Sequence, residues 1–224
     1  MKVLITGFPA GPWATNCYVV APSSDTECII IDPGYESLKQ IKEIVTEHKL
    51  KPIAVLITHG HIDHMWSVTP LADGYGIPAI IHEADRALLS RPEQGVSDAG
   101  REMILQLGGK FSEPQSISTF QGDSQISLLG FTFSMLHLPG HTPGSIAYHL
   151  AEQTTLFSGD VLFESGIGRT DLPGGSSVLM QQSIQKLFNT VPDETTVLCG
   201  HGNQTTIGVE RMNNPYIQDW LQHA

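Results

Sequence analysis

Four stretches of apolar and β-branched residues in this chain each run directly into a histidine or an aspartate. They are IAVLIT before His59, FSMLHLPG before His141, TTLFSG before Asp160 and TTVLCG before His201. Short apolar runs of this kind are typical of buried strands. Polar side chains at the ends of strands are held rigidly and reach solvent. The pattern therefore predicts sheets whose strand ends carry a chemically functional site.

Other runs of this kind, with helical patterns between them, predict strands and helices that mix over the whole length. The predicted strands are Val3–Phe8, Cys17–Val20, Cys28–Ile31, Ala54–Ile57, Ala79–Ile81, Phe131–Leu136, Ser145–Leu150, Thr154–Phe157 and Thr196–Cys199. The predicted helices are Ser37–His48 with Ser37 as N-cap, Met65–Ala72, Ser177–Phe188 and a weaker one around Met103 and Leu107. We expect a long loop at Gly166–Gly175 and one α/β domain over residues 1–224, with helices covering sheets.

The densest group of metal-binding side chains is the heptad Thr58-His59-Gly60-His61-Ile62-Asp63-His64. Buried imidazoles without partners are costly, so a core would not gather three of them without a purpose. Gly60 lets the chain bend so that His59 and His61 can reach one ion. Asp63 and His64 are adjacent and diverge, so they could serve a second ion. Imidazole and carboxylate donors suit zinc, iron or manganese, and such sites often keep an open position for water.

The other histidines and the cysteines have plainer interpretations. Structural zinc usually uses thiolates, but no cysteine here is placed for that. Cys17, Cys28 and Cys199 lie in or beside apolar runs and are expected to be buried thiols. His48 and His223 are expected to be solvated.

Charge and hydropathy limit the partners. The net charge of −11 argues against a nucleic-acid partner, because phosphate binding needs a basic face. No apolar run approaches the ~20 residues of a membrane span, and the N-terminal run is too short for a signal peptide. We therefore expect a cytoplasmic protein that does not bind membranes, while its oligomeric state stays open.

The motifs resemble those of the metallo-β-lactamase superfamily. Its signature T-H-x-H-x-D-H matches residues 58–64, and its later motifs match PGHTPGS at 139–145, SGD at 158–160 and GHG at 200–202, in the same order. Asp32 in IDPG matches an acidic residue that ends an early strand in the family. Within the superfamily, FSGDVLFESGIGRTDLPGGS and GHGNQTTIGVERMNNPY resemble glyoxalase II, the hydroxyacylglutathione hydrolases. The similarity is to the short bacterial form, which lacks the C-terminal helical domain.

The resemblance implies a fold and a ligand set. The implied fold is an αββα sandwich of two mixed β-sheets flanked by helices. His59, His61 and His141 would hold a first metal, and Asp63, His64 and His201 a second, with Asp160 bridging both. The implied cofactors are two divalent ions, first of all zinc, with iron or manganese as alternatives. Asp63 and Asp160 are expected to be catalytic as well as metal-binding.

Two further residues have a predicted role and a competing interpretation. Asp32 is expected to hydrogen-bond a metal ligand or anchor its loop, although a simple turn at Pro33 and Gly34 would also explain it. In long glyoxalase II enzymes a Lys and a Tyr after the bridging aspartate contact glutathione. This chain has Arg169-Thr170-Asp171 there. Arg169 could bind a substrate carboxylate with its planar fork, or it could pair with Asp171 and only shape the loop.

The predicted reaction is hydrolysis of a small acyl-thiol such as S-lactoylglutathione by a hydroxide bridging two metal ions. Two such ions lower the pKa of the water between them and clamp the reacting oxygens. A thiolate leaves without strong acid help because thiol pKa values are near ~8.5, which favours a thioester over an amide. The alternatives are a persulfide dioxygenase with one iron on His59, His141 and Asp160, a lactonase or β-lactamase, and a binding module without catalysis.

Overall fold

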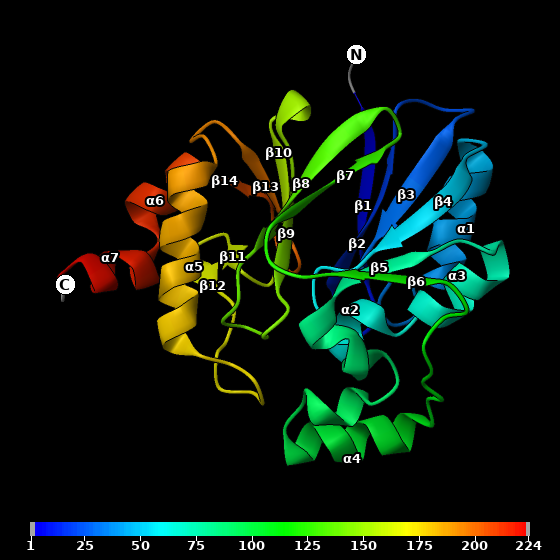
Figure 1. Cartoon of the computed structure of the whole chain (residues 1–224), viewed down its shortest axis with the longest axis horizontal. Helices are drawn as coiled ribbons and strands as arrows, with labels where there is room; N and C mark the ends of the chain where they lie inside the picture. The colour runs from blue at the N-terminus through cyan, green and yellow to red at the C-terminus, as the bar shows by residue number, and fades with distance from the viewer. Residues whose placement is uncertain (1–2, 223–224) are drawn as a thin grey trace.

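The computed structural model describes residues 3–222, which form four layers in the order helices, sheet, sheet, helices (Figure 1). In spatial order, the first sheet contains β1 (Leu4–Ala10), β2 (Thr15–Ala21), β3 (Glu27–Ile31), β4 (Lys51–Leu56), β5 (Ala79–His82) and β6 (Ile117–Phe120). The second contains β14 (Thr205–Thr206), β13 (Thr196–Cys199), β10 (Thr155–Gly159), β9 (Ile146–Leu150), β8 (Phe131–His137) and β7 (Ser124–Leu128). Both sheets are mixed, since each has parallel and antiparallel neighbours.

Helices cover both outer faces of the sandwich, and a third group lies at one end of it (Figure 1). On the first sheet lie α1 (Leu38–Glu47) and α3 (Val68–Tyr75); on the second lie α5 (Ser177–Thr190), α6 (Ile207–Asn213) and α7 (Pro215–Gln222). At the end lie α2 (Ile62–Met65) and α4 (Asp98–Leu107). The short elements are β11 (Leu162–Phe163), β12 (Gly166–Ile167) and the 3-10 helices η1 (Glu83–Leu89), η2 (Pro92–Gln94) and η3 (Ala151–Gln153).

Three apolar clusters fill the spaces between the four layers. Strand β3 shows how its sequence produces this, because successive side chains of a strand point to opposite faces. Cys28 and Ile30 pack toward α1, while Ile29 and Ile31 pack between the sheets. A third cluster joins α5 to the outer face of the second sheet. The continuous apolar run of β3 thus marks a strand buried on both faces, as in other covered sheets.

The structure confirms the predicted αββα sandwich of two mixed sheets. It corrects the single helix predicted over Met65–Ala72, which is divided between α2 and α3. Ser67 lies at the break, where its backbone N–H donates to Pro33 O (2.9 Å) and its hydroxyl to Gly34 O (2.7 Å). Contacts with a distant turn therefore end α2, and local propensity does not show them.

Smaller differences concern one cap and the edges of the sheets. Ser37 precedes α1, but its hydroxyl donates to Gly34 O at 2.9 Å and does not cap the helix. The edge strands β6 and β7 were not predicted, because they carry polar residues between their apolar ones. Most of Gly166–Gly175 is loop, as predicted, although β12 occupies its first two residues. Within residues 3–222, no helix is both long and apolar enough to cross a membrane. His223 lies outside the described residues.

Candidate metal centre

Parallel strand pairs bring the predicted site residues to one end of the sandwich. Strands β10 and β13 run parallel, so Asp160 and His201, which follow them, emerge side by side. A Cβ at Gly200 would overlap Oδ1 of Asp160, so only glycine permits this approach. Strands β3 and β4 are also parallel, and they deliver Asp32 and His59 to the same end. Sheet topology therefore gathers residues that are far apart in sequence.

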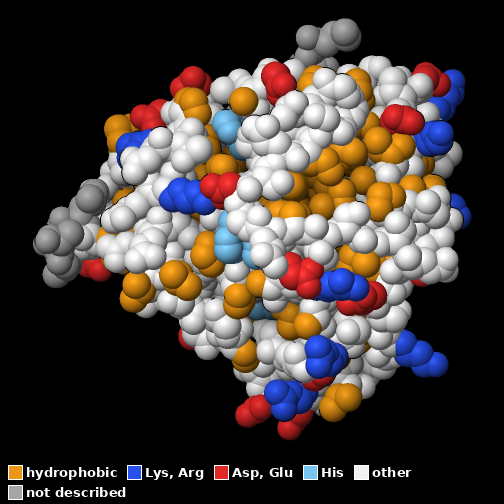
Figure 2. All heavy atoms as spheres, viewed as in Figure 1, with side chains coloured by type: hydrophobic (Ala, Val, Ile, Leu, Met, Phe, Trp, Pro, Cys, Tyr) orange, Lys and Arg blue, Asp and Glu red, His pale blue; other side chains and the backbone are white. Residues whose placement is uncertain are grey.

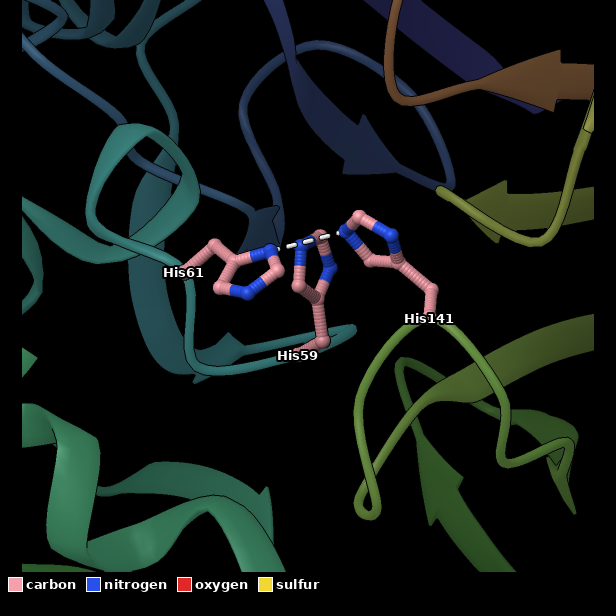
Figure 3. Close-up of side chains that lie close together, drawn as sticks. All are labelled: His59, His61 and His141. Atoms are coloured by element: carbon pink, nitrogen blue, oxygen red, sulfur yellow. Dashed lines mark hydrogen bonds between the residues drawn. The ribbon is translucent and has the colours of Figure 1, made fainter. Parts of the chain in front are cut away.

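All seven predicted metal ligands lie in this one cluster. Their candidate ligand atoms fall into three overlapping groups, within each of which the atoms lie within 4.8 Å of one another. The groups are His59, His61 and His141; Asp63, His64 and His201; and His59, His64 and Asp160. The first two match the two ligand sets implied by the family resemblance. Figure 3 shows the rings of the first group converging, with His61 Nδ1 2.8 Å from His141 Nε2.

Asp160 lies between the two groups. Its Oδ1 is 3.2 Å from His64 Nε2, in the second group. Its Oδ2 is 3.5 Å from His141 Nε2, in the first, and 3.4 Å from His201 Nε2, in the second. One carboxylate thus reaches donors of both groups, which is the position expected for a bridging ligand.

Four of the five clustered histidines are oriented through Nδ1, which leaves Nε2 directed into the cluster. Nδ1 of His64 lies 2.9 Å from Asp32 Oδ2, and Nδ1 of His59 lies 3.1 Å from Thr58 Oγ1. The other two contacts are to backbone oxygens, from His141 Nδ1 to Arg169 O (2.7 Å) and from His201 Nδ1 to Trp13 O (3.1 Å). Such outer partners fix the tautomer and the ring orientation of metal-binding histidines.

Asp32 connects one candidate ligand, His64, to the loop that carries another, His59. It accepts hydrogen bonds from the backbone N–H of Thr58 (2.8 Å) and from its hydroxyl (2.6 Å), in addition to its contact with His64. Asp32 itself is 2% exposed and has a left-handed backbone (φ 50°). It therefore orients one ligand and anchors the loop that carries His59, and it does more than form a turn with Pro33.

Sequence reasoning missed two residues that hold the ligands in place. The hydroxyl of Thr15 donates to Asp63 Oδ2 at 2.9 Å. Asp85, fully buried in η1, accepts from Gly60 N (2.8 Å), Gly144 N (2.8 Å) and the Thr142 hydroxyl (2.7 Å). Asp85 thus ties the His59–His61 loop to the His141 loop. A carboxylate just after the strand predicted at Ala79–Ile81 was the available signal.

Two histidines of the first group, His59 and His61, have neutral rings. Burial, reinforced by the neighbouring imidazoles, lowers the pKa of His59 well below its usual value. Burial and the adjacent His141 lower the pKa of His61 to about 3. At neutral pH both rings therefore offer unprotonated nitrogens to a cation.

The second group carries charge. Burial disfavours the charged form of His64, but the carboxylates of Asp160, Asp63 and Asp32 outweigh burial and raise its pKa. Burial also disfavours the charged form of His201, but hydrogen bonds with Asp160 and Asp63 outweigh burial and raise its pKa to about 9. In the metal-free protein these two histidines therefore balance the buried carboxylates.

We expect metal binding at the two groups to depend differently on pH. His59 and His61 have no proton to lose near neutrality, whereas a metal must displace protons from His64 and His201. Affinity at the second group should therefore rise with pH until about 9, the pKa of His201. Zinc titration calorimetry in buffers of different ionisation enthalpy should show proton release in only one of two binding events. Equal proton release in both events would be inconsistent with this charge distribution.

The residues fit divalent metal ions. Among the described residues, buried atoms without a hydrogen-bond partner include His59 Nε2, His61 Nε2 and Asp160 Oδ1, all in this cluster. Asp160 Oδ1 lies near His64 Nε2 but lacks hydrogen-bond geometry. Buried polar atoms without partners are rare in folded proteins. A cation that accepts the lone pairs of His59 Nε2 and Asp160 Oδ1 explains these two atoms, and imidazole and carboxylate donors suit zinc, iron or manganese.

A cavity of about 360 Å³ opens onto the cluster. His61, Asp63, His141, Asp160 and His201 form part of its lining. The other walls are largely apolar and come from the segment around α4 and from loops near both sheets. Figure 2 shows one face of the molecule, on which apolar, charged and histidine side chains lie close together. A small molecule can therefore reach the candidate ligands directly.

Comparisons with known proteins agree with this geometry. The profile of the metallo-beta-lactamase superfamily matches residues 10–201. Hydroxyacylglutathione hydrolase GloC of Haemophilus influenzae is 35% identical over 212 residues, 93% of this chain and 95% of that protein. The crystal structure of BLEG-1 B3 metallo-beta-lactamase is 36% identical with a TM-score of 0.82, and the match covers 96% of this chain and 99% of that one. The structure of TTHA1623 in a di-iron-bound form is 32% identical with a TM-score of 0.75, and the match covers 96% and 100%. The chain belongs to the metallo-β-lactamase superfamily of metal-dependent hydrolases.

Proposed function

We propose that this protein is a binuclear thioester hydrolase of glyoxalase II type. His59, His61 and His141 would hold one divalent ion, Asp63, His64 and His201 the other, and Asp160 would contact both. Bound together, two such ions supply a nucleophilic hydroxide at neutral pH and stabilise the negative charge that develops on a carbonyl oxygen. The di-iron form of TTHA1623 and the two ligand groups joined at Asp160 support this assignment.

The choice of substrate rests on which acidic side chains line the cavity. Asp63 and Asp160 are the carboxyl side chains among its described lining residues, and both belong to the ligand cluster. No separate acid is therefore placed to protonate a leaving group. A thiolate needs little protonation to leave, because thiol pKa values are near ~8.5, whereas an amide nitrogen must be protonated. The apolar walls would exclude water around the acyl group.

The likeness to BLEG-1 B3 metallo-beta-lactamase makes β-lactam hydrolysis the second candidate. Hydrolysis of a β-lactam breaks an amide bond in a ring, so the leaving group is a nitrogen. The absence of a separate acid in the described cavity lining favours the thioester, and so does the likeness to GloC.

Metal-loaded protein should hydrolyse S-lactoylglutathione with steady turnover, measured as thiol release, and should leave a cephalosporin intact. β-Lactam hydrolysis without thioester turnover would move the assignment to the second candidate. About one iron per chain, with oxygen uptake on a glutathione persulfide and no thioester turnover, would instead indicate a dioxygenase.

A further inference from the structure

Arg169 is fixed at the mouth of the cavity by its main chain. Its carbonyl oxygen accepts the hydrogen bond from His141 Nδ1 at 2.7 Å. The preceding Gly168 packs so tightly that a Cβ there would overlap the backbone oxygen of Asp160. The Arg169 side chain lines the cavity and is 60% exposed. Its position is therefore set by the metal cluster, and the loop cannot carry it away without disturbing two ligands.

Asp171 occupies the hydrogen-bonding fork of this arginine. Nε of Arg169 donates to Asp171 Oδ1 and Nη2 donates to Oδ2, both at 2.7 Å. The hydrogen bond from Arg169 lowers the pKa of Asp171 to about 2, so the pair stays ionised near neutral pH. Such a bidentate pair occupies the Nε–Nη2 edge of the guanidinium, one of the two edges that could otherwise grip a substrate carboxylate. Because Asp171 is only two residues away, its effective concentration at Arg169 exceeds that of any dissolved anion.

Beyond the metal cluster, the described cavity lining offers a negative group no basic side chain other than Arg169. Arg169 is the one lysine or arginine among the described lining residues. The apolar side chains of the lining include Trp13, Ile62, Val96, Met103 and Leu172. A carboxylate entering here would lose part of its hydration and meet no unpaired arginine or lysine among the residues described there, because Arg169 is paired with Asp171. The net charge of −11 adds long-range repulsion.

We propose that this cavity selects thioesters whose thiol portion carries no negative charge, and that Asp171 enforces the selection by masking Arg169. The inference rests on the proposed thioesterase function, because it defines the substrate class of the same site. Asp171 acts as a repulsive element against anionic thiols, and the apolar walls favour uncharged ones. Discrimination of this kind often depends on a group placed against the wrong ligand.

The matched probes are S-D-lactoylglutathione and its diethyl ester, which share the acyl group and the skeleton but differ in their two carboxylates. For the wild-type protein we expect kcat/KM, measured by thiol release, to be at least about fivefold higher for the diester. Asp171→Asn should shift this ratio about tenfold toward the free acid, because the fork of Arg169 becomes available. The double variant Arg169→Met, Asp171→Asn should lose that gain.

Asp193→Asn is the matched control. Like Asp171→Asn, it removes an exposed carboxylate that pairs with an arginine, here Arg211. Neither Asp193 nor Arg211 is among the described residues that line the cavity. The substitution changes the net charge by the same amount and should leave the ratio of the two substrates unchanged. A shift as large as that of Asp171→Asn would show that overall charge, and not the masking of Arg169, sets the preference, and would overturn the proposal.

Binding separates this inference from the proposed function. Calorimetry with the non-hydrolysable S-hexylglutathione and its diethyl ester reports the same preference without turnover. Tighter binding of the diester, reversed by Asp171→Asn, would support the inference even if no thioester were hydrolysed, in which case only the thioesterase assignment would fail. Tighter binding of the free acid by the wild-type protein would overturn the inference and leave the assignment intact.

Discussion

Replacing Asp160 by asparagine is expected to lower kcat/KM for a thioester by about 10³-fold or more. Asp160 is the side chain that reaches donors of both metal groups, with its oxygens 3.2 Å from His64 Nε2 and 3.5 Å from His141 Nε2. The amide keeps the shape but removes the charge, and it leaves one oxygen to serve two groups. Steady-state kinetics and elemental analysis on one preparation should show the loss of activity together with a loss of bound metal.

Asp193→Asn serves as the control for this experiment too. It makes the same chemical change at an exposed position where the carboxylate pairs with Arg211, and exposed pairs contribute about 0–1 kcal/mol. Its activity and metal content should match those of the wild-type protein. An Asp160→Asn variant that kept full metal content and near-normal turnover would show that this carboxylate does not link the two groups.

Replacing Asp85 by alanine should destabilise the protein by about 3 kcal/mol or more and lower metal affinity at the first group by about 10–100-fold. Asp85 is fully buried, and the substitution would strand two backbone N–H groups and remove one of the two partners of the Thr142 hydroxyl. Those donors belong to the two loops that carry His59, His61 and His141. Urea unfolding and zinc titration measure the two effects.

Two further variants distinguish positioning from simple loss of packing. Asp85→Asn fills the same volume, but all three of its neighbours are donors, so its amide N–H would face another N–H. We expect Asp85→Asn to fold and still to bind zinc more weakly at the first group. Glu113→Gln removes a partly exposed carboxylate that pairs with Arg86, the residue next to Asp85, and should change neither quantity appreciably. Normal zinc affinity in folded Asp85→Asn would refute a positioning role.

The layered fold and the ligand cluster were accessible from sequence because each has a local signal. Apolar runs such as Cys28–Ile31 mark strands buried on both faces, and the heptad from Thr58 to His64 concentrates donors that a core would not collect. The exact ligand groups came from the family resemblance. The structure brings the same residues together through parallel strand pairs, which local periodicity cannot reveal.

Features that depend on contacts between residues far apart in the chain could not be predicted from the sequence. Asp85 contacts residues 25 to 59 positions away, and Thr15 reaches Asp63 across 48. The break between α2 and α3 depends on Ser67 meeting the turn at Pro33 and Gly34. The role of Arg169 was left between two interpretations. The structure shows its pairing with Asp171, while substrate binding by Arg169 stays a prediction.

Elemental analysis of protein purified without added metal, and again after incubation with zinc and gel filtration, shows whether the cluster binds two metal ions. We expect about two metal ions per chain in the zinc-treated wild-type protein, and clearly fewer after the double substitution His61→Ala and Asp63→Ala, which removes one ligand from each group. A folded wild-type protein that retains no more than traces of zinc, iron or manganese under these conditions would contradict this expectation.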